Sequence, residues 1–138
     1  MKKKVVVFDQ IITDVHEAMR ELDKCQTIAI DIETSGLSPW KDKIAVIAMC
    51  GVETGQFAVL HTRGFVPPEF IEWMSKPRKW IAHNTVGFDG LFFANHGVNI
   101  FNSKWHDTLV AEQVVVQTDR RDVSVSLKAS IKRRLGIE

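Results

Sequence analysis

Tyrosine is absent from this 138-residue sequence, and cysteine occurs only twice. Cys25 and Cys50 lie far apart and outside any Cys-x-x-Cys or Cys/His cluster, which argues against zinc binding and redox chemistry and favours two buried thiols. No apolar run approaches the roughly 18 residues that cross a bilayer. The run at residues 5–8, after the N-terminal lysines, is too short for a secretion signal. We therefore expect a soluble, cytoplasmic protein with no membrane partner.

Length and composition fit one domain that spans residues 1–138. A chain that is 45% hydrophobic can bury a core, and 138 residues are too few for two domains. The formal net charge of +1 is uneven, because from Asp119 onward six basic residues accompany three acidic ones, which leaves +3 there and −2 elsewhere. Such a basic end suits contact with a phosphate backbone. The alternative is a solvated helix face, because Leu127, Ile131 and Leu135 recur at the spacing of an apolar helix stripe.

Hydrophobic periodicity predicts an α/β fold in which strands precede and then alternate with helices. The predicted strands are residues 5–8, 27–31, 44–50, 56–60 and 79–82, and the predicted helices are residues 13–25, a segment that starts at Pro67, a segment from Asp89 to near Gly97, and two helices that begin near Asp107 and Ser126. The strand at 44–50 is nearly all apolar, so we expect both of its faces to be covered.

Two acidic residues end the apolar run that begins at Thr27. Asp31 and Glu33 are two positions apart on a predicted strand, so their side chains point to the same face. Adjacent anions repel and raise the pKa of one of them, unless a hard divalent cation holds both ionised. The alternative is a pair of solvated acids at a strand end.

A second acidic segment follows the strand at 79–82. His83, Asn84 and Phe88 lead to Asp89, and a strand-to-helix junction here would bring Asp89 to the edge of the sheet as a third carboxylate. The alternative is that the Asn or the Asp caps the next helix.

Together the two segments resemble the first two motifs of the DEDD superfamily of 3′-to-5′ exonucleases, Asp-x-Glu and Asn-x2-3-Phe/Tyr-Asp. The matching residues are Asp31, Glu33, Asn84, Phe88 and Asp89. The similarity runs from about Val5 to Glu138, through Gly-Leu-Ser-Pro at 36–39, His-Asp-Thr-Leu at 106–109 and the Ser-Leu-Lys helix start at 126–128, which is similar to the ribonuclease D and proofreading-domain branch. This resemblance implies a ribonuclease H-like mixed sheet flanked by helices.

The resemblance also implies a two-metal hydrolysis of phosphodiester bonds with Mg²⁺ or Mn²⁺. Asp31 would bridge the two ions, Glu33 would complete the site of one, and Asp89 would hold the other. The main chain near Thr34 and the side chain of Leu37 would hold the terminal nucleotide.

Three further residues are candidates for substrate contacts. Trp40 lies in a Ser-Pro-Trp-Lys turn, where a base could stack on its ring, although a core position is the alternative. Asn84 either contacts the substrate or braces its loop. Phe88 either lines the pocket or packs in the core.

The family's third motif, Tyr-x3-Asp or His-x3-Asp, does not occur in this sequence. In the family it lies beyond the Ser-Leu-Lys helix, so we expect a C-terminally incomplete domain that lacks the last helices. Asp107, Asp119 and Asp122 are candidates for the fourth carboxylate by residue type only, and a helix cap or loop role is the better interpretation of each.

The leading interpretation is a metal-dependent 3′-to-5′ exonuclease that acts on single-stranded 3′ ends of DNA or RNA. It would be free-standing or the proofreading part of a polymerase, which would be its partner or the C-terminal continuation of the same polypeptide. The alternative is a catalytically incomplete relative that binds nucleic acid or a protein without cutting.

Overall fold

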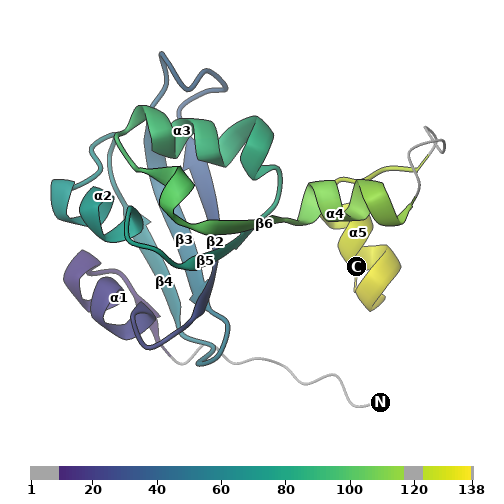
Figure 1. Cartoon of the computed structure of the whole chain (residues 1–138), viewed down its shortest axis with the longest axis horizontal. Coiled ribbons are helices and arrows are strands. Elements are labelled where there is room, and N and C mark those ends of the chain that lie inside the picture. Colours follow the sequence, from purple (N-terminus) through teal and green to yellow (C-terminus); the bar gives the residue numbers. More distant parts are fainter. Residues whose placement is uncertain (1–9, 117–122, 138) are drawn as a thin grey trace.

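The computed structural model describes residues 10–116 and 123–137 (Figure 1). The predicted strand at residues 5–8 lies outside the described residues. Six strands form one mixed sheet in the order β1-β4-β3-β2-β5-β6. They are β1 (Ile11–Ile12), β2 (Thr27–Thr34), β3 (Ile44–Gly51), β4 (Phe57–His61), β5 (Lys79–Ala82) and β6 (Lys104–Asp107). The α/β prediction is confirmed.

Strand directions divide the sheet into two parts. β3 pairs antiparallel with β2 and with β4, as expected for a meander with a hairpin. β5 pairs parallel with β2, and β6 pairs parallel with β5. The carboxyl ends of β2, β5 and β6 therefore meet at one edge of the sheet. β6 was not predicted, because four residues with two buried only in part carry little periodicity.

The helices begin close to the predicted starts, and the first, predicted at residues 13–25, is shorter than predicted. They are α1 (Val15–Leu22), α2 (Pro68–Met74), the π-helical turn η1 (Thr85–Asp89), α3 (Gly90–Asn95), the 3₁₀ turn η2 (Ile100–Asn102), α4 (Thr108–Val115) and α5 (Leu127–Leu135). Asp14 caps α1 by accepting from the Glu17 amide at 2.8 Å. Ser126 caps α5 and Asp107 caps α4. Each cap satisfies amides that have no partner inside the helix.

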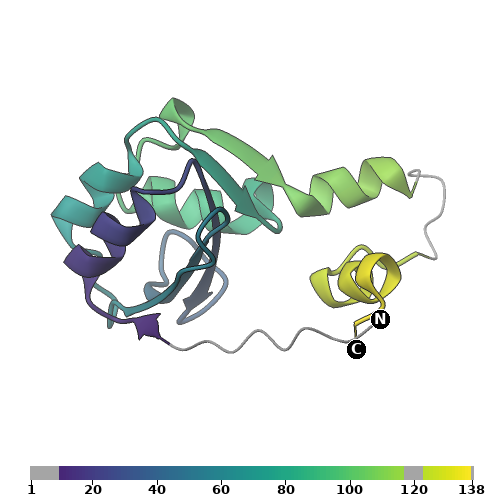
Figure 2. The same ribbon diagram turned by 90° about the horizontal axis from the view of Figure 1, so that it is seen from below.

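One face of the sheet carries the core. Ile28 on β2, Trp80 on β5 and Trp105 on β6 are in register across the sheet, and Trp80 is fully buried. Trp73 of α2 meets the ring of Trp80 edge-on at 5.8 Å between centroids, and Phe93 of α3 lies 6.5 Å from Trp105. These contacts place α2 and α3 on this face, and α1 lies beside α2 (Figure 2).

The opposite face of the sheet is only partly buried in the described structure. Val46, Ala48 and Cys50 of β3 have intermediate exposure, whereas Ile47 and Met49 between them are buried. The prediction that both faces of this strand are covered is therefore wrong for the described residues. α4 and α5 extend beyond the end of β6 instead of covering this face (Figures 1 and 2). None of the described helices has the length and apolar character that a membrane span requires.

Candidate active site

β2 presents Asp31 and Glu33 on the partly exposed face of the sheet. Ile30 and Ile32 alternate with the two acids and are buried in the core, so both acids point the other way. Their cross-strand neighbours on β3 are Ala48 opposite Asp31 and Val46 opposite Glu33. Within residues 10–116 and 123–137, no lysine or arginine forms an ion pair with either acid.

The chain leaves β5 through a tight turn that leads to Asp89. Asn84 adopts the left-handed conformation with φ 66° and ψ 37°, and η1 follows it. Single π-helical turns occur frequently at functional sites. Gly90 follows the turn. A glycine is needed there, because a Cβ at this position would lie 2.8 Å from the Thr85 carbonyl oxygen. This backbone carries Asp89 to a position where its side chain is only 3% exposed.

The charge environment of Asp89 is unfavourable for an isolated carboxylate. Its Oδ2 is buried and has no hydrogen-bond partner among the described residues. Burial, followed by the negative charges of Asp31 and Asp107, raises the pKa of Asp89 from 3.8 to about 7. The negative charge of Asp31 thus acts on Asp89, and the assignment of the two residues to one metal site stays a prediction.

Asp31 is also destabilised as an anion. Burial and then the charge of Glu33 raise the pKa of Asp31, and His83 opposes this shift. A divalent cation with oxygen ligands would relieve the repulsion at both Asp31 and Asp89, so these side chains fit Mg²⁺ or Mn²⁺ by their chemistry. In the described structure, however, no three acidic, histidine or cysteine side chains are gathered tightly enough to form a metal site as they stand.

Asp107 is the N-cap of α4, which agrees with the helix-cap interpretation of its sequence position. Its Oδ1 accepts hydrogen bonds from the amides of Leu109 at 2.9 Å and Val110 at 3.4 Å. Burial disfavours the anion, but hydrogen bonds from backbone amides outweigh burial and lower the pKa of Asp107 below its usual value. The other two candidates for the fourth carboxylate, Asp119 and Asp122, lie outside the described residues.

The loop after β2 exposes two large apolar side chains. Leu37 is 84% exposed and Trp40 is 73% exposed, so Trp40 is not a core residue. Asn95 of α3 holds this loop by donating from Nδ2 to the Pro39 carbonyl at 2.7 Å. The Thr34 hydroxyl donates a hydrogen bond to the Gly36 carbonyl at 2.6 Å, so this side chain contacts the loop itself.

The two remaining substrate candidates sit at η1. Phe88 lies 4.9 Å from the ring of Phe92, centroid to centroid, and packs against the core. Asn84 directs its side chain toward Gly87, where its Oδ1 occupies the space that a Cβ would need. Phe88 therefore contacts α3, and Asn84 contacts η1.

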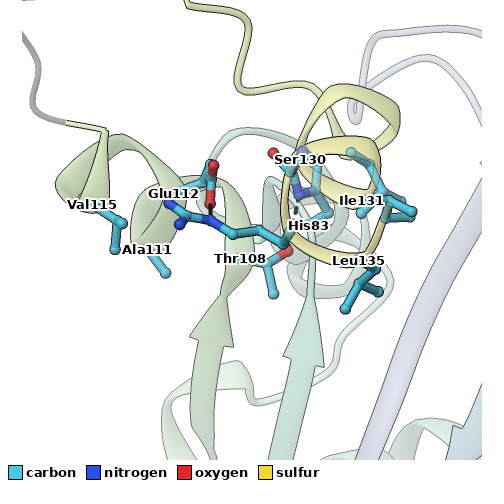
Figure 3. A pocket seen from close by; sticks show the side chains of 10 residues that line it. His83, Thr108, Ala111, Glu112, Val115, Ser130, Ile131 and Leu135 are labelled. Atoms are coloured by element: carbon cyan, nitrogen blue, oxygen red, sulfur yellow. Dashed lines mark hydrogen bonds and ion pairs between the residues drawn. The ribbon is translucent and has the colours of Figure 1, made fainter. Parts of the chain in front are cut away.

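A pocket of about 390 Å³ lies between α4, α5 and the end of β5. Figure 3 shows His83, Thr108 and Glu112 at this pocket, and His83 Nδ1 is 2.9 Å from the Thr108 hydroxyl oxygen. Glu112 is buried and accepts from Arg133 at 3.0 Å and from Arg134 at 3.2 Å. Arg133 and Arg134 belong to the basic end for which the sequence suggested phosphate contacts. Both are instead paired with Glu112, and the sequence did not predict this pairing.

Comparison with known proteins supports the fold. No protein-family model and no curated protein matches the sequence. A solved structure described as the apo form of a nuclease has a TM-score of 0.70 and 25% identity, over 91% of this chain and 58% of that one. NrnC of Brucella melitensis bound to pGG has a TM-score of 0.66 and 23% identity, over 83% and 55% of the two chains. NrnC has also been solved with bound Mg²⁺.

A third similar structure is RNase D of Escherichia coli, an exoribonuclease involved in structured RNA processing. It has a TM-score of 0.63 and 16% identity, over 93% of this chain and 33% of its own. The chain thus spans 58% or less of the length of these three structures. The chain has a ribonuclease H-like fold, and the solved structures that share this fold are nucleases, which agrees with the resemblance drawn from the two acidic motifs.

Proposed function

We propose that the chain is a metal-dependent 3′-to-5′ exonuclease domain that hydrolyses phosphodiester bonds at the 3′ end of DNA or RNA. The observation that carries this proposal is the buried Asp89, whose Oδ2 lacks a partner among the described residues and on which the negative charge of Asp31 acts. A buried anion next to a second anion is unstable alone and becomes stable when a cation binds.

Asp31, Glu33 and Asp89 are the residues that would hold two Mg²⁺ or Mn²⁺ ions. Bound there, the ions would supply an activated water and charge stabilisation at the leaving oxygen. The residues of the chain would supply the rest. The exposed Leu37 and Trp40 would contact the terminal bases, since an aromatic face stacks on any base. The main chain at Thr34, with Asn84 and Phe88 at η1, would border the terminal nucleotide.

Solved structures support this proposal at two points. NrnC, which shares the fold, binds pGG in one structure and Mg²⁺ in another. The EXD2 exonuclease domain, with 12% identity and a TM-score of 0.52, was soaked with Mn and GMP. A single-stranded 3′ end is therefore the substrate that we assign to this chain. The link to a polymerase, as a partner or as part of the same polypeptide, stays a prediction.

The proposal is tested with a 5′-labelled single-stranded oligonucleotide, as DNA and as RNA, in the presence of Mn²⁺. We expect products that shorten from the 3′ end. Asp31→Asn and Glu33→Gln should abolish them, whereas Asp14→Asn and Glu69→Gln should not, because Asp14 caps α1 and Glu69 lies on α2.

Metal binding is measured in the same preparations. Mn²⁺ should raise the thermal stability of the unmodified protein by an amount that grows as RT ln(1 + [L]/Kd), and Asp31→Asn should remove this increment. An increment that is the same in both proteins would refute the role of Asp31. Oligonucleotide binding without cutting would instead favour a relative that binds nucleic acid without cutting it.

A further inference from the structure

The carboxylate of Asp107 joins two helix starts that are far apart in the sequence. Its Oδ1 accepts from the amide of Asn84 at 2.9 Å, and its Oδ2 accepts from the amide of Val86 at 3.1 Å. The same side chain accepts from the amides of Leu109 and Val110 at the start of its own helix, α4. Asp107 therefore receives hydrogen bonds from α4 and from the segment 84–89, which comprises Asn84 and η1 and is called the Asp89 turn below.

The Asp89 turn has no cap of its own. Asn84 occupies the position before η1, and its side chain makes no capping hydrogen bond. The first amides of a helical turn lack partners within that turn and need an acceptor from elsewhere. Asp107 supplies this acceptor from the end of β6, where it is in register with Ala82 of β5. The left-handed backbone of Asn84 is held by the same contact.

We propose that Asp107 is a positioning residue for the metal site, because it fixes the backbone at Asn84 and Val86 and thereby presents Asp89 to Asp31. This inference rests on the proposed function. Asp107 does not act as the fourth metal ligand in this arrangement, since both of its oxygens face backbone amides. The contact with Val86 lies three residues before Asp89, within the same five-residue turn.

The geometry requires an aspartate at this position. An asparagine offers one acceptor oxygen, so its amide nitrogen would face the N–H of Val86 or those of Asn84 and Leu109. A serine would still cap α4, because a hydroxyl is a good N-cap, but a single short oxygen would not also serve the Asp89 turn. Asp107→Ser therefore separates the cap of α4 from the support of the turn.

The test compares Asp107→Ser and Asp107→Asn with Asp14→Ser in the full chain. Asp14 is a matched control, because it is the N-cap of α1, another eight-residue helix, and within residues 10–116 and 123–137 its side chain accepts only from the Glu17 amide of that helix. Mn²⁺ affinity is measured by the electron paramagnetic resonance signal of free Mn²⁺. Hydrogen exchange of the Asn84 and Val86 amides is measured in metal-free protein.

We expect both Asp107 variants to bind Mn²⁺ about 10- to 100-fold more weakly, the range seen when a residue that orients metal ligands is replaced. Exchange at Asn84 and Val86 should be faster in both variants. Asp14→Ser should leave the Mn²⁺ affinity and the exchange at these two amides unchanged. Because Asp107→Ser keeps the α4 cap, its circular dichroism should match that of the unmodified protein.

Three results separate the possible failures. If the unmodified protein binds Mn²⁺ and the Asp107 variants bind it equally well, the positioning role is refuted and the proposed function stands. If the unmodified protein does not bind Mn²⁺, the proposed function is refuted and this inference with it. If Asp14→Ser weakens Mn²⁺ binding as much as Asp107→Ser does, the effect is a general loss of stability and the inference is refuted.

Discussion

Replacing Asp89 by asparagine should stabilise the metal-free protein at about pH 8, and this advantage should disappear at about pH 4. Asp89 is 3% exposed, its Oδ2 has no hydrogen-bond partner in the described part of the chain, and Asp31 and Asp107 add negative charge nearby. These conditions raise the pKa of Asp89 in the folded protein to about 7 from an ordinary value of 3.8. An uncharged amide of the same shape escapes this penalty.

The sign of the effect follows from which state binds more protons. Below pH 3.8, Asp89 is protonated in both states and costs nothing. Between pH 3.8 and about 7 the unfolded chain loses its proton while the folded protein keeps it, so the free energy of unfolding falls as the pH rises. Above about pH 7 both states are ionised and the penalty stays constant.

The magnitude follows from the same two pKa values. The difference between about 7 and 3.8 is about 3 pH units, and about 1.36 kcal/mol per unit gives a penalty of about 4 kcal/mol. A buried asparagine amide without a full set of hydrogen-bond partners would itself cost roughly 1–3 kcal/mol, which reduces the gain. We therefore expect Asp89→Asn to be about 1–3 kcal/mol more stable than the unmodified protein at about pH 8.

The assay is urea unfolding of both proteins with EDTA, at several pH values between about 4 and 8. The difference in unfolding free energy should grow with pH in favour of Asp89→Asn. Added Mn²⁺ should then stabilise the unmodified protein and leave the variant unchanged. A difference that is constant across the pH range would refute the burial of an ionisable Asp89 beside Asp31.

Two further predictions concern the loop after β2 and the α4–α5 pair. Trp40→Ala should weaken binding of a single-stranded oligonucleotide by roughly 1–3 kcal/mol. The urea midpoint should not change, because Trp40 is 73% exposed. The control Phe101→Ala removes a 92% exposed ring from η2 and should leave oligonucleotide binding unchanged. Glu112→Gln should loosen α5 from α4, because the charges of Arg133 and Arg134 lose their partner; limited trypsin digestion should cut α5 faster in this variant, and equal cutting rates would contradict the role of the ion pairs.

Local sequence patterns determined most of the strands and caps. The strand at 79–82 has the predicted bounds, and β2, β3 and β4 lie within a few residues of theirs, because branched and aromatic residues between turn signals favour extended backbone. Asp31 and Glu33 share a face because the two-residue period of a strand leaves no other choice. The caps at Asp14 and Ser126 are also local features, since each accepts a hydrogen bond from an amide three residues later.

Only the tertiary structure decided what lies around these residues. The burial of Asp89 depends on the parallel pairing of β2 with β5, and the second role of Asp107 depends on hydrogen bonds to amides more than twenty residues earlier in the chain. The partial exposure of one face of β3 likewise could not be predicted from its apolar sequence, because the composition of a strand does not say which helices reach it. The sequence by itself determined which acids are present and which way the strand turns them, whereas contacts between distant segments decided how deeply each acid is buried and which groups hold it in place.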